Sequence, residues 1–182
     1  MQHMVRTINS RPELLRALPE LKGKVLGCWC LPEKCHAQTL MELCESKYIK
    51  NWFSNMLPFD KPLIYQRIEY KTVENFYQAM KLPRLSELRK EIAEMSPYKA
   101  KTTIRDKNKY LWDSEWSKDK ALKVMKYALD YKFQKGTEWH RKLMITKEIG
   151  IDIIEFNNWS DTYWGIDIKT RIGENHLGKM LM

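Results

Sequence analysis

The 182-residue sequence predicts an α+β protein that is predominantly helical, with a few short strands and a small helix-strand-helix appendage at its N-terminus. Two observations support this fold class. Apolar residues recur at helical spacing through most of the chain from residue 72 onward, whereas the segments with strand character are short. The composition, 43% hydrophobic and 12% aromatic with 7 Trp, is that of an ordered globular protein.

The appendage is expected over residues 1–46. Residues 10–13 have the spacing of a capping box with a proline in the first turn, so a short helix should begin there and end near Pro19. The apolar run at 25–29 favours a strand, and residues 32–46 return to helical spacing. A unit of this size is too small to bury a core of its own.

The main domain is expected over residues 50–182. Residues 63–70 are its best extended segment, and residues 152–156 resemble a buried strand. Apolar spacing predicts five helices, at 72–81, 85–95, 97–107, 119–133 and 137–149. A long polar and aromatic loop then leads into a last helical turn at 176–182.

The charge balance is basic, with 32 Lys and Arg against 23 Asp and Glu and a formal net charge of +9. Such a protein attracts polyanions, phosphate-bearing metabolites or acidic membranes, although a lysine-rich solvated surface gives the same balance. No window approaches the ~20 apolar residues of a membrane-spanning helix, and the N-terminus lacks the pattern of a signal peptide. We therefore expect a cytoplasmic protein, in the host cytoplasm if a phage encodes it.

The cysteines lie in the first quarter of the chain, and in a cytoplasmic protein they should be thiols rather than disulfides. Cys28 and Cys30 alternate on one side of the predicted strand, while Cys35 and His36 open the next helix. These four could converge on structural zinc, or a thiolate at the helix N-terminus could be reactive. Because the spacing is not that of a zinc ribbon or finger, we favour buried thiols and predict no metal and no cofactor.

A polar stripe runs along the predicted helix at 72–81. At about 100° per residue, Glu74, Gln78 and Lys81 share this stripe, a third of a turn from the apolar face. From spacing alone such a stripe is more often a solvated flank than an active site. Aromatic and polar clusters at 52–55, 112–116 and 160–165 favour a site, because stacking on flat rings is worth ~1–3 kcal/mol per base.

The clusters occur in the same order as in the NADAR superfamily, which the sequence resembles over about residues 51–182. The motifs are WFSNM, YKTVENFYQAMKL, a tryptophan ahead of VMKYALDYKF, SDTYWG and GENHLGKMLM. YbiA-like members of this superfamily include N-glycosidases of riboflavin intermediates. The first 46 residues resemble the C-terminal half of a small phage and bacterial domain of unknown function.

The resemblance implies a helical fold that hydrolyses a bond between a ribose and a base nitrogen. Family members remove ADP-ribose from guanine bases in nucleic acid, or act on phosphoribosylamino pyrimidines of riboflavin synthesis. The positive net charge favours nucleic acid as the partner over the small molecule. A non-catalytic module that binds ADP-ribose or nucleic acid is a further alternative.

Matched to the family motifs, Glu74 is the catalytic glutamate, Lys81 the catalytic lysine and Asp161 a second catalytic carboxylate. A carboxylate can stabilise the positive charge that develops at the anomeric carbon, and a deprotonated lysine can attack an opened sugar and form a Schiff base. The resemblance implies substrate binding by Phe53, Asn55, Gln78, Trp116, Trp164, Gly165 and Asn175. The aromatic members of this set are expected to hold the flat base.

Overall fold

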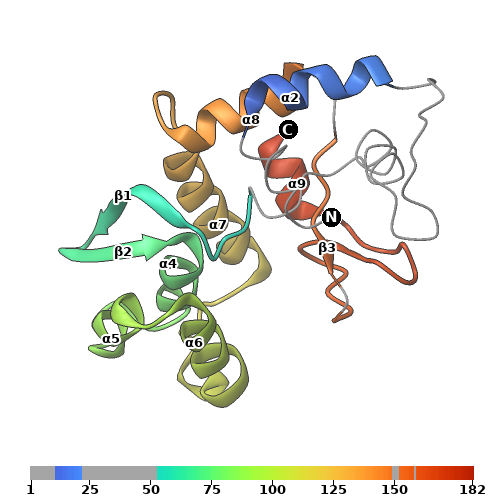
Figure 1. Ribbon diagram of the computed structural model, residues 1–182. Coiled ribbons are helices and arrows are strands. Elements are labelled where there is room, and N and C mark those ends of the chain that lie inside the picture. The colour runs from blue at the N-terminus through green and yellow to red at the C-terminus, as the bar shows by residue number, and fades with distance from the viewer. Residues whose placement is uncertain (1–10, 22–52, 149–151, 158) are drawn as a thin grey trace, which may run out of the picture. The chain divides into compact units, whose positions relative to one another are not determined.

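The computed structural model describes residues 11–21, 53–148, 152–157 and 159–182 (Figure 1). They belong to two compact units, which are treated one at a time. We call Asn51–Arg141 the central unit, and Met1–Lys50 together with Lys142–Met182 the terminal unit. The strand predicted at 25–29 and the helix predicted at 32–46 lie outside the described residues.

An antiparallel hairpin of β1 (Pro58–Tyr65) and β2 (Ile68–Thr72) opens the described part of the central unit. Gln66 and Arg67 form its two-residue turn, with φ of 52° and 63°. Tight hairpin turns need this positive φ, which Asn and Gly usually supply. The single extended segment predicted at 63–70 is therefore two strands, joined by residues that give no turn signal in the sequence.

Helix α4 (Val73–Met80) follows β2 directly and is buried along its whole length. Thr72 caps it, because the Thr72 hydroxyl accepts a hydrogen bond from the backbone N–H of Asn75 at 3.1 Å and donates to Asn75 Oδ1 at 2.6 Å. The Asn75 amide in turn donates to the carbonyls of Ile92 and Met95. The helix predicted here is confirmed, and it is the central element of its unit.

The other helices of the central unit surround α4 (Figure 1). They are α5 (Leu88–Glu94), α6 (Pro97–Lys101), the π-helical turn η2 (Thr102–Lys107), the 3-10 turn η3 (Lys109–Leu111) and α7 (Lys118–Lys132). α4 contacts α5, α6 and α7. The core between them is apolar and includes Leu63, Tyr70, Val73, Phe76, Leu82, Ile92, Ile104, Met125 and Leu129. The helices predicted at 85–95, 97–107 and 119–133 are thus present.

Helix α8 (Glu138–Glu148), predicted at 137–149, begins in the central unit. Its first backbone N–H, that of Glu138, donates to the Asp60 carboxylate at 2.7 Å. The negative charge of Asp60 also suits the positive end of the helix dipole. None of the helices in the described ranges is long and apolar enough to cross a membrane, and α7, at 15 residues, is the longest of them.

The terminal unit contains α2 (Pro12–Ala17), the 3-10 turn η1 (Leu18–Leu21), β3 (Phe156–Asn157), β4 (Ile166–Asp167) and α9 (His176–Leu181). β3 and β4 pair in parallel. The strand predicted at 152–156 is largely absent, since strand structure begins only at Phe156. The physical reason is that the Asn175 side chain takes the carbonyl of Ile153 and the N–H of Glu155, so these groups do not enter a ladder.

Candidate active site

The polar stripe of α4 is not a solvated flank. Glu74, Gln78 and Lys81 are only 6%, 2% and 4% exposed. Burying charged and polar groups is costly unless they find partners, so their contacts decide what they can do chemically.

The Glu74 carboxylate is held from its own helix. Gln78, one turn later, donates through Nε2 to Glu74 Oε1 at 2.7 Å. The Glu74 backbone N–H donates to the Asn55 carbonyl at 3.0 Å, in the first turn of α4, where the helix dipole favours an anion. Since Gln78 uses its N–H group on the carboxylate, its Oε1 is left as an acceptor, with no hydrogen-bond partner among the described residues.

Aromatic rings flank the Lys81 ammonium. Its Nζ lies 4.8 Å from the centre of the Tyr77 ring and 4.5 Å from that of Trp112. Trp116 packs edge-on against Tyr77 at 5.6 Å and Trp112 at 6.4 Å. We call Tyr77, Trp112 and Trp116 the aromatic cluster. It stabilises the Lys81 cation through its ring faces, whereas the burial of Nζ works against the charge.

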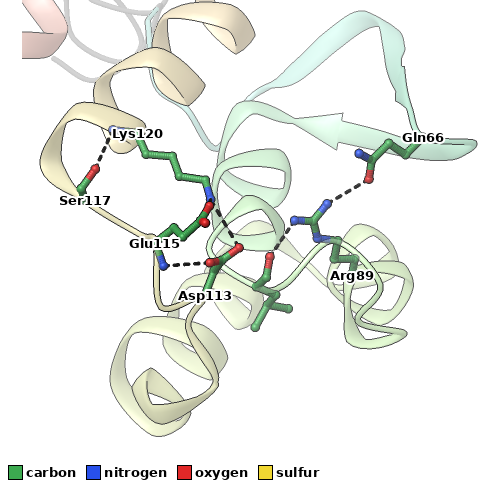
Figure 2. A network of polar contacts seen from close by, with 7 residues as sticks. Gln66, Arg89, Asp113, Glu115, Ser117 and Lys120 are labelled. Atoms are coloured by element: carbon green, nitrogen blue, oxygen red, sulfur yellow. Dashed lines mark hydrogen bonds and ion pairs between the residues drawn. The ribbon is translucent and has the colours of Figure 1, made fainter.

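Backbone contacts fix the end of α4 beside this cluster. Asp113 donates its backbone N–H to the Lys81 carbonyl at 2.7 Å. The Asp113 carboxylate accepts from the Glu115 N–H at 2.9 Å and from Lys120 Nζ at 3.3 Å (Figure 2). The Glu115 bond is the largest cause of a lowered pKa for Asp113, and Lys120 lowers it further.

A second anchor lies one residue after Lys81. Arg89 donates through Nη2 to the Leu82 carbonyl at 2.6 Å and through Nη1 to Gln66 Oε1 at 3.0 Å (Figure 2). Arg89 is buried, and this burial lowers the pKa of its guanidinium. Together, Asp113 and Arg89 hold the carbonyls of Lys81, the residue that carries the buried amine, and of Leu82, which follows it.

The loop at 53–55 contacts both α4 and α7. Asn55 reaches Met125 on α7, with its Nδ2 3.6 Å from the sulfur, and the Ser54 carbonyl accepts from Lys132 Nζ at 2.7 Å. Asn55 Oδ1 is buried and has no hydrogen-bond partner in the described part of the chain. Asn55 Oδ1 and Gln78 Oε1 are therefore two buried acceptors on residues that contact Glu74.

Lys132 is a functional candidate for which the sequence analysis assigned no role. It is 1% exposed, and its Nζ lies 4.6 Å from the centre of the Trp139 ring and 5.6 Å from that of Phe133. The Phe133 ring also contacts Phe53, with centres 5.6 Å apart. The only sequence signal was a lysine at a core-facing position of the predicted helix. Tyr77 lies on the apolar face of the helix predicted at 72–81 and Trp112 in the aromatic and polar cluster at 112–116, and neither position alone indicates a role in the site.

In the terminal unit, Asp161 organises its own loop. Its Oδ1 accepts the backbone N–H groups of Tyr163 and Trp164 at 3.1 and 2.9 Å. The Asp161 N–H and carbonyl both bind the Asn157 side chain, at 2.9 and 2.7 Å. These contacts show how the loop presents Trp164, whose ring centre is 5.1 Å from that of Tyr163. The catalytic role of Asp161 stays a prediction.

Asn175 and Gly165 pack tightly against residues 153–155. The Asn175 amide donates to the Ile153 carbonyl at 2.9 Å and accepts from the Glu155 N–H at 3.0 Å. A Cβ added to Gly165 would collide with the Glu155 carbonyl, which explains the glycine. Both residues thus have a structural role, and their contact with substrate stays a prediction.

The predicted site residues divide between the two units. The central unit holds six of them, Phe53, Asn55, Glu74, Gln78, Lys81 and Trp116. The terminal unit holds Asp161, Trp164, Gly165 and Asn175. Within the central unit, contacts link Glu74 to Gln78 and Asn55, and Lys81 to the aromatic cluster.

The described residues contain no group of three or more His, Cys, Asp or Glu side chains that could hold a metal ion. The cysteine cluster of Cys28, Cys30, Cys35 and His36 lies outside them. That these cysteines are buried thiols without a metal stays a prediction.

Comparison with known proteins identifies two regions of the chain. Residues 43–182 match the NADAR domain, and residues 1–46 match a domain of unknown function, DUF4326. No curated protein matches. Among solved structures, the NMR structure of the E. coli protein YbiA is similar, with a TM-score of 0.58 and 31% identity over 75% of this chain and 77% of that one. The resemblance to the NADAR superfamily that the motifs indicate is confirmed, and so is the predicted fold class.

Proposed function

The chain belongs to the NADAR family, and on this premise we propose that it is an N-glycosidase that removes ADP-ribose from guanine bases in nucleic acid. The observation that carries the proposal is the placement of two buried ionisable side chains on one helix, Glu74 in its first turn and Lys81 at its C-cap. Glu74 and Lys81 are both more than nine-tenths buried, and they stand two turns apart, about 10 Å along the axis of α4.

Glu74 would act where positive charge develops. As the ribose ring opens at the bond between C1′ and the ring oxygen, C1′ and the base nitrogen share that charge, and a fixed carboxylate stabilises it. Gln78 keeps Oε1 of Glu74 in place, so the second carboxylate oxygen is the one we assign to the sugar. Such fixed orientation lowers the cost of reorganisation during the reaction.

Lys81 would act as the nucleophile. When the ribose ring opens, the ring oxygen takes up a proton, and C1′ and the base nitrogen form an iminium. The neutral Lys81 amine adds to C1′ and passes one proton to the base nitrogen; the bond from C1′ to that nitrogen then breaks, and the base leaves. Water then hydrolyses the resulting Lys81 imine, which frees ADP-ribose and restores the amine. The reaction consumes one water in total, with no oxidant or reductant.

The aromatic cluster supports a substrate with a flat base. Trp116 is half-exposed, so a base could stack on its ring, whereas Tyr77 is buried. The buried acceptors Gln78 Oε1 and Asn55 Oδ1 suit hydroxyl groups of a ribose, because a substrate hydroxyl would supply the donor that each of them lacks.

The test is turnover of two substrates by the full chain. One is an oligonucleotide that carries ADP-ribosyl guanine, and the other is a phosphoribosylamino pyrimidine of riboflavin synthesis, with products followed by mass spectrometry. We expect free ADP-ribose from the oligonucleotide and little product from the pyrimidine. Turnover of the pyrimidine alone would replace the proposed substrate by the riboflavin intermediate. Binding of the oligonucleotide without product would identify a binding module instead.

A further inference from the structure

The segment 97–111, which we call the basic segment, concentrates positive charge. It comprises α6, η2 and η3 and contains five Lys or Arg residues but one acidic residue. Elsewhere in the central unit, many exposed cations pair with carboxylates: Lys71 with Glu94, Lys90 with Glu87, Lys123 with Asp119, Lys126 with Asp130 and Arg141 with Glu138. Lys99 and Lys109 form no ion pair with any described residue, so both ammonium groups are available to an external anion.

Two tyrosines project from the same segment. Tyr98 is 72% exposed and Tyr110 is 80% exposed, although tyrosine rings are usually at least half-buried. Tyr98 directly precedes Lys99, and Tyr110 directly follows Lys109, the two lysines without an ion pair within the described ranges. Flat rings beside cations are what single-stranded nucleic acids bind, with bases stacked on the rings and phosphates on the cations.

The basic segment folds back on itself and reaches the candidate active site. Asn108 Nδ2 donates to the Thr103 carbonyl at 3.0 Å, and Trp112 Nε1 donates to the Ile104 carbonyl at 3.0 Å. Lys109 Nζ lies 5.5 Å from the centre of the Trp112 ring, the same ring that Lys81 contacts at 4.5 Å. One indole is therefore shared by the basic segment and the proposed nucleophile.

We infer that the basic segment is a docking surface for single-stranded nucleic acid, with phosphates on Lys99 and Lys109 and bases on Tyr98 and Tyr110. The inference rests on the proposed function and deepens it, since it names the strand that would bring a modified base to Lys81. An acidic peptide would use the lysines but not the ring faces, and a duplex keeps its bases stacked away from them.

The test measures binding of an unmodified, fluorescein-labelled single strand by anisotropy, so it is independent of turnover. We expect the double variant Lys99→Gln/Lys109→Gln to bind at least fivefold more weakly at low salt, with a salt slope shallower by roughly 1.4 for two lost phosphate contacts. Tyr98→Ala/Tyr110→Ala should bind at least tenfold more weakly, and Tyr98→Phe/Tyr110→Phe should bind like the wild type. The matched control, Lys123→Gln/Lys126→Gln, makes the same change of net charge on α7. Its affinity for the strand should stay within twofold of the wild-type affinity.

The inference is overturned if the wild type does not bind the strand, if the control loses as much affinity as the lysine variant, or if duplex or polyglutamate binds as tightly as the single strand. Thermal unfolding of each variant checks that it is folded. If the strand binds as described but no ADP-ribose is released from a modified one, the proposed function fails and the docking surface stands. If ADP-ribose is released from a modified strand and the rate does not depend on these four residues, the docking surface fails and the proposed function stands.

Discussion

The Lys81 ammonium lies 4.5 Å from the centre of the Trp112 ring, although 31 positions separate the two residues in the chain. The indole is itself fixed by its hydrogen bond to the Ile104 carbonyl. The position of the proposed nucleophile therefore depends on a ring supplied from outside α4.

Replacing Trp112 should impair turnover more than folding. Trp112→Ala removes the ring face from Lys81, and we expect kcat to fall 10- to 100-fold, because the amine loses a contact worth about 0.5–2 kcal/mol and its fixed position. Trp112→Phe keeps an aromatic ring, so its kcat should fall less than that of Trp112→Ala. Steady-state kinetics on ADP-ribosylated oligonucleotide measure both. Equal kcat for Trp112→Ala and the wild type would mean that the ring does not position Lys81.

Lys132 should be needed to hold the loop at 53–55. Lys132→Met removes the donor to the Ser54 carbonyl, and we expect a loss of about 1–3 kcal/mol in the free energy of unfolding together with a lower kcat. Lys135→Met, at an exposed position nearby in the chain, is the control and should change unfolding by less than about 0.5 kcal/mol. Urea titration followed by tryptophan fluorescence gives both values. A Lys132→Met protein as stable as the control would rule out this role.

Tyr70 should make stability depend on pH in the alkaline range. Its hydroxyl is buried without a hydrogen-bond partner among the described residues, and burial raises its pKa from 10.0 to about 12, with Arg89 opposing part of this rise. Because the folded-state pKa is the higher one, stability from the protonated hydroxyl is complete below pH 10 and is lost as the pH rises through 12. Tyr70→Phe lacks this loss, so its stability relative to the wild type should increase from pH 9 toward pH 12 in denaturant titrations. A constant difference would contradict the assignment.

Asn175 should contribute to stability whether or not it binds substrate. Asn175→Ala leaves the Ile153 carbonyl and the Glu155 N–H without their side-chain partner, and it places alanine at a φ of 52°. We expect unfolding to become easier by about 2–4 kcal/mol. Asn175→Gly relieves the backbone and should recover part of the loss, as measured by thermal unfolding. A neutral Asn175→Ala variant would show that these contacts do not hold the loop.

Much of the central unit could be predicted from local signals. The helix at 72–81 begins at a threonine that caps it and continues with apolar residues at helical spacing, so its existence did not depend on tertiary contacts. The burial of Glu74, Gln78 and Lys81 could not be predicted in this way, because it results from other segments, such as the one that carries Trp112. The neighbouring aromatic and polar clusters and the family resemblance indicated a site there.

Two segments adopt a structure that differs from the one their sequence predicts, and tertiary pairing is the cause in each. Gln66 and Arg67 adopt positive φ in a turn that their residue types do not favour, and the hairpin pairing imposes it. Residues 152–155 have strand composition, yet the Asn175 side chain from 20 positions later binds their backbone groups. In the first place the pairing across the hairpin, and in the second a contact distant in sequence, overrides local preference.

The central claim is that Glu74 and Lys81 cleave a ribosyl bond to a base. The most direct measurement is single-turnover release of free ADP-ribose from an oligonucleotide that carries ADP-ribosyl guanine, for the wild type, Glu74→Gln, Lys81→Ala and the exposed controls Glu91→Gln and Lys126→Ala. We expect release by the wild type and both controls, and a rate at least 100-fold slower in Glu74→Gln and in Lys81→Ala while binding of the strand persists. Release at the wild-type rate by Lys81→Ala or Glu74→Gln would contradict it.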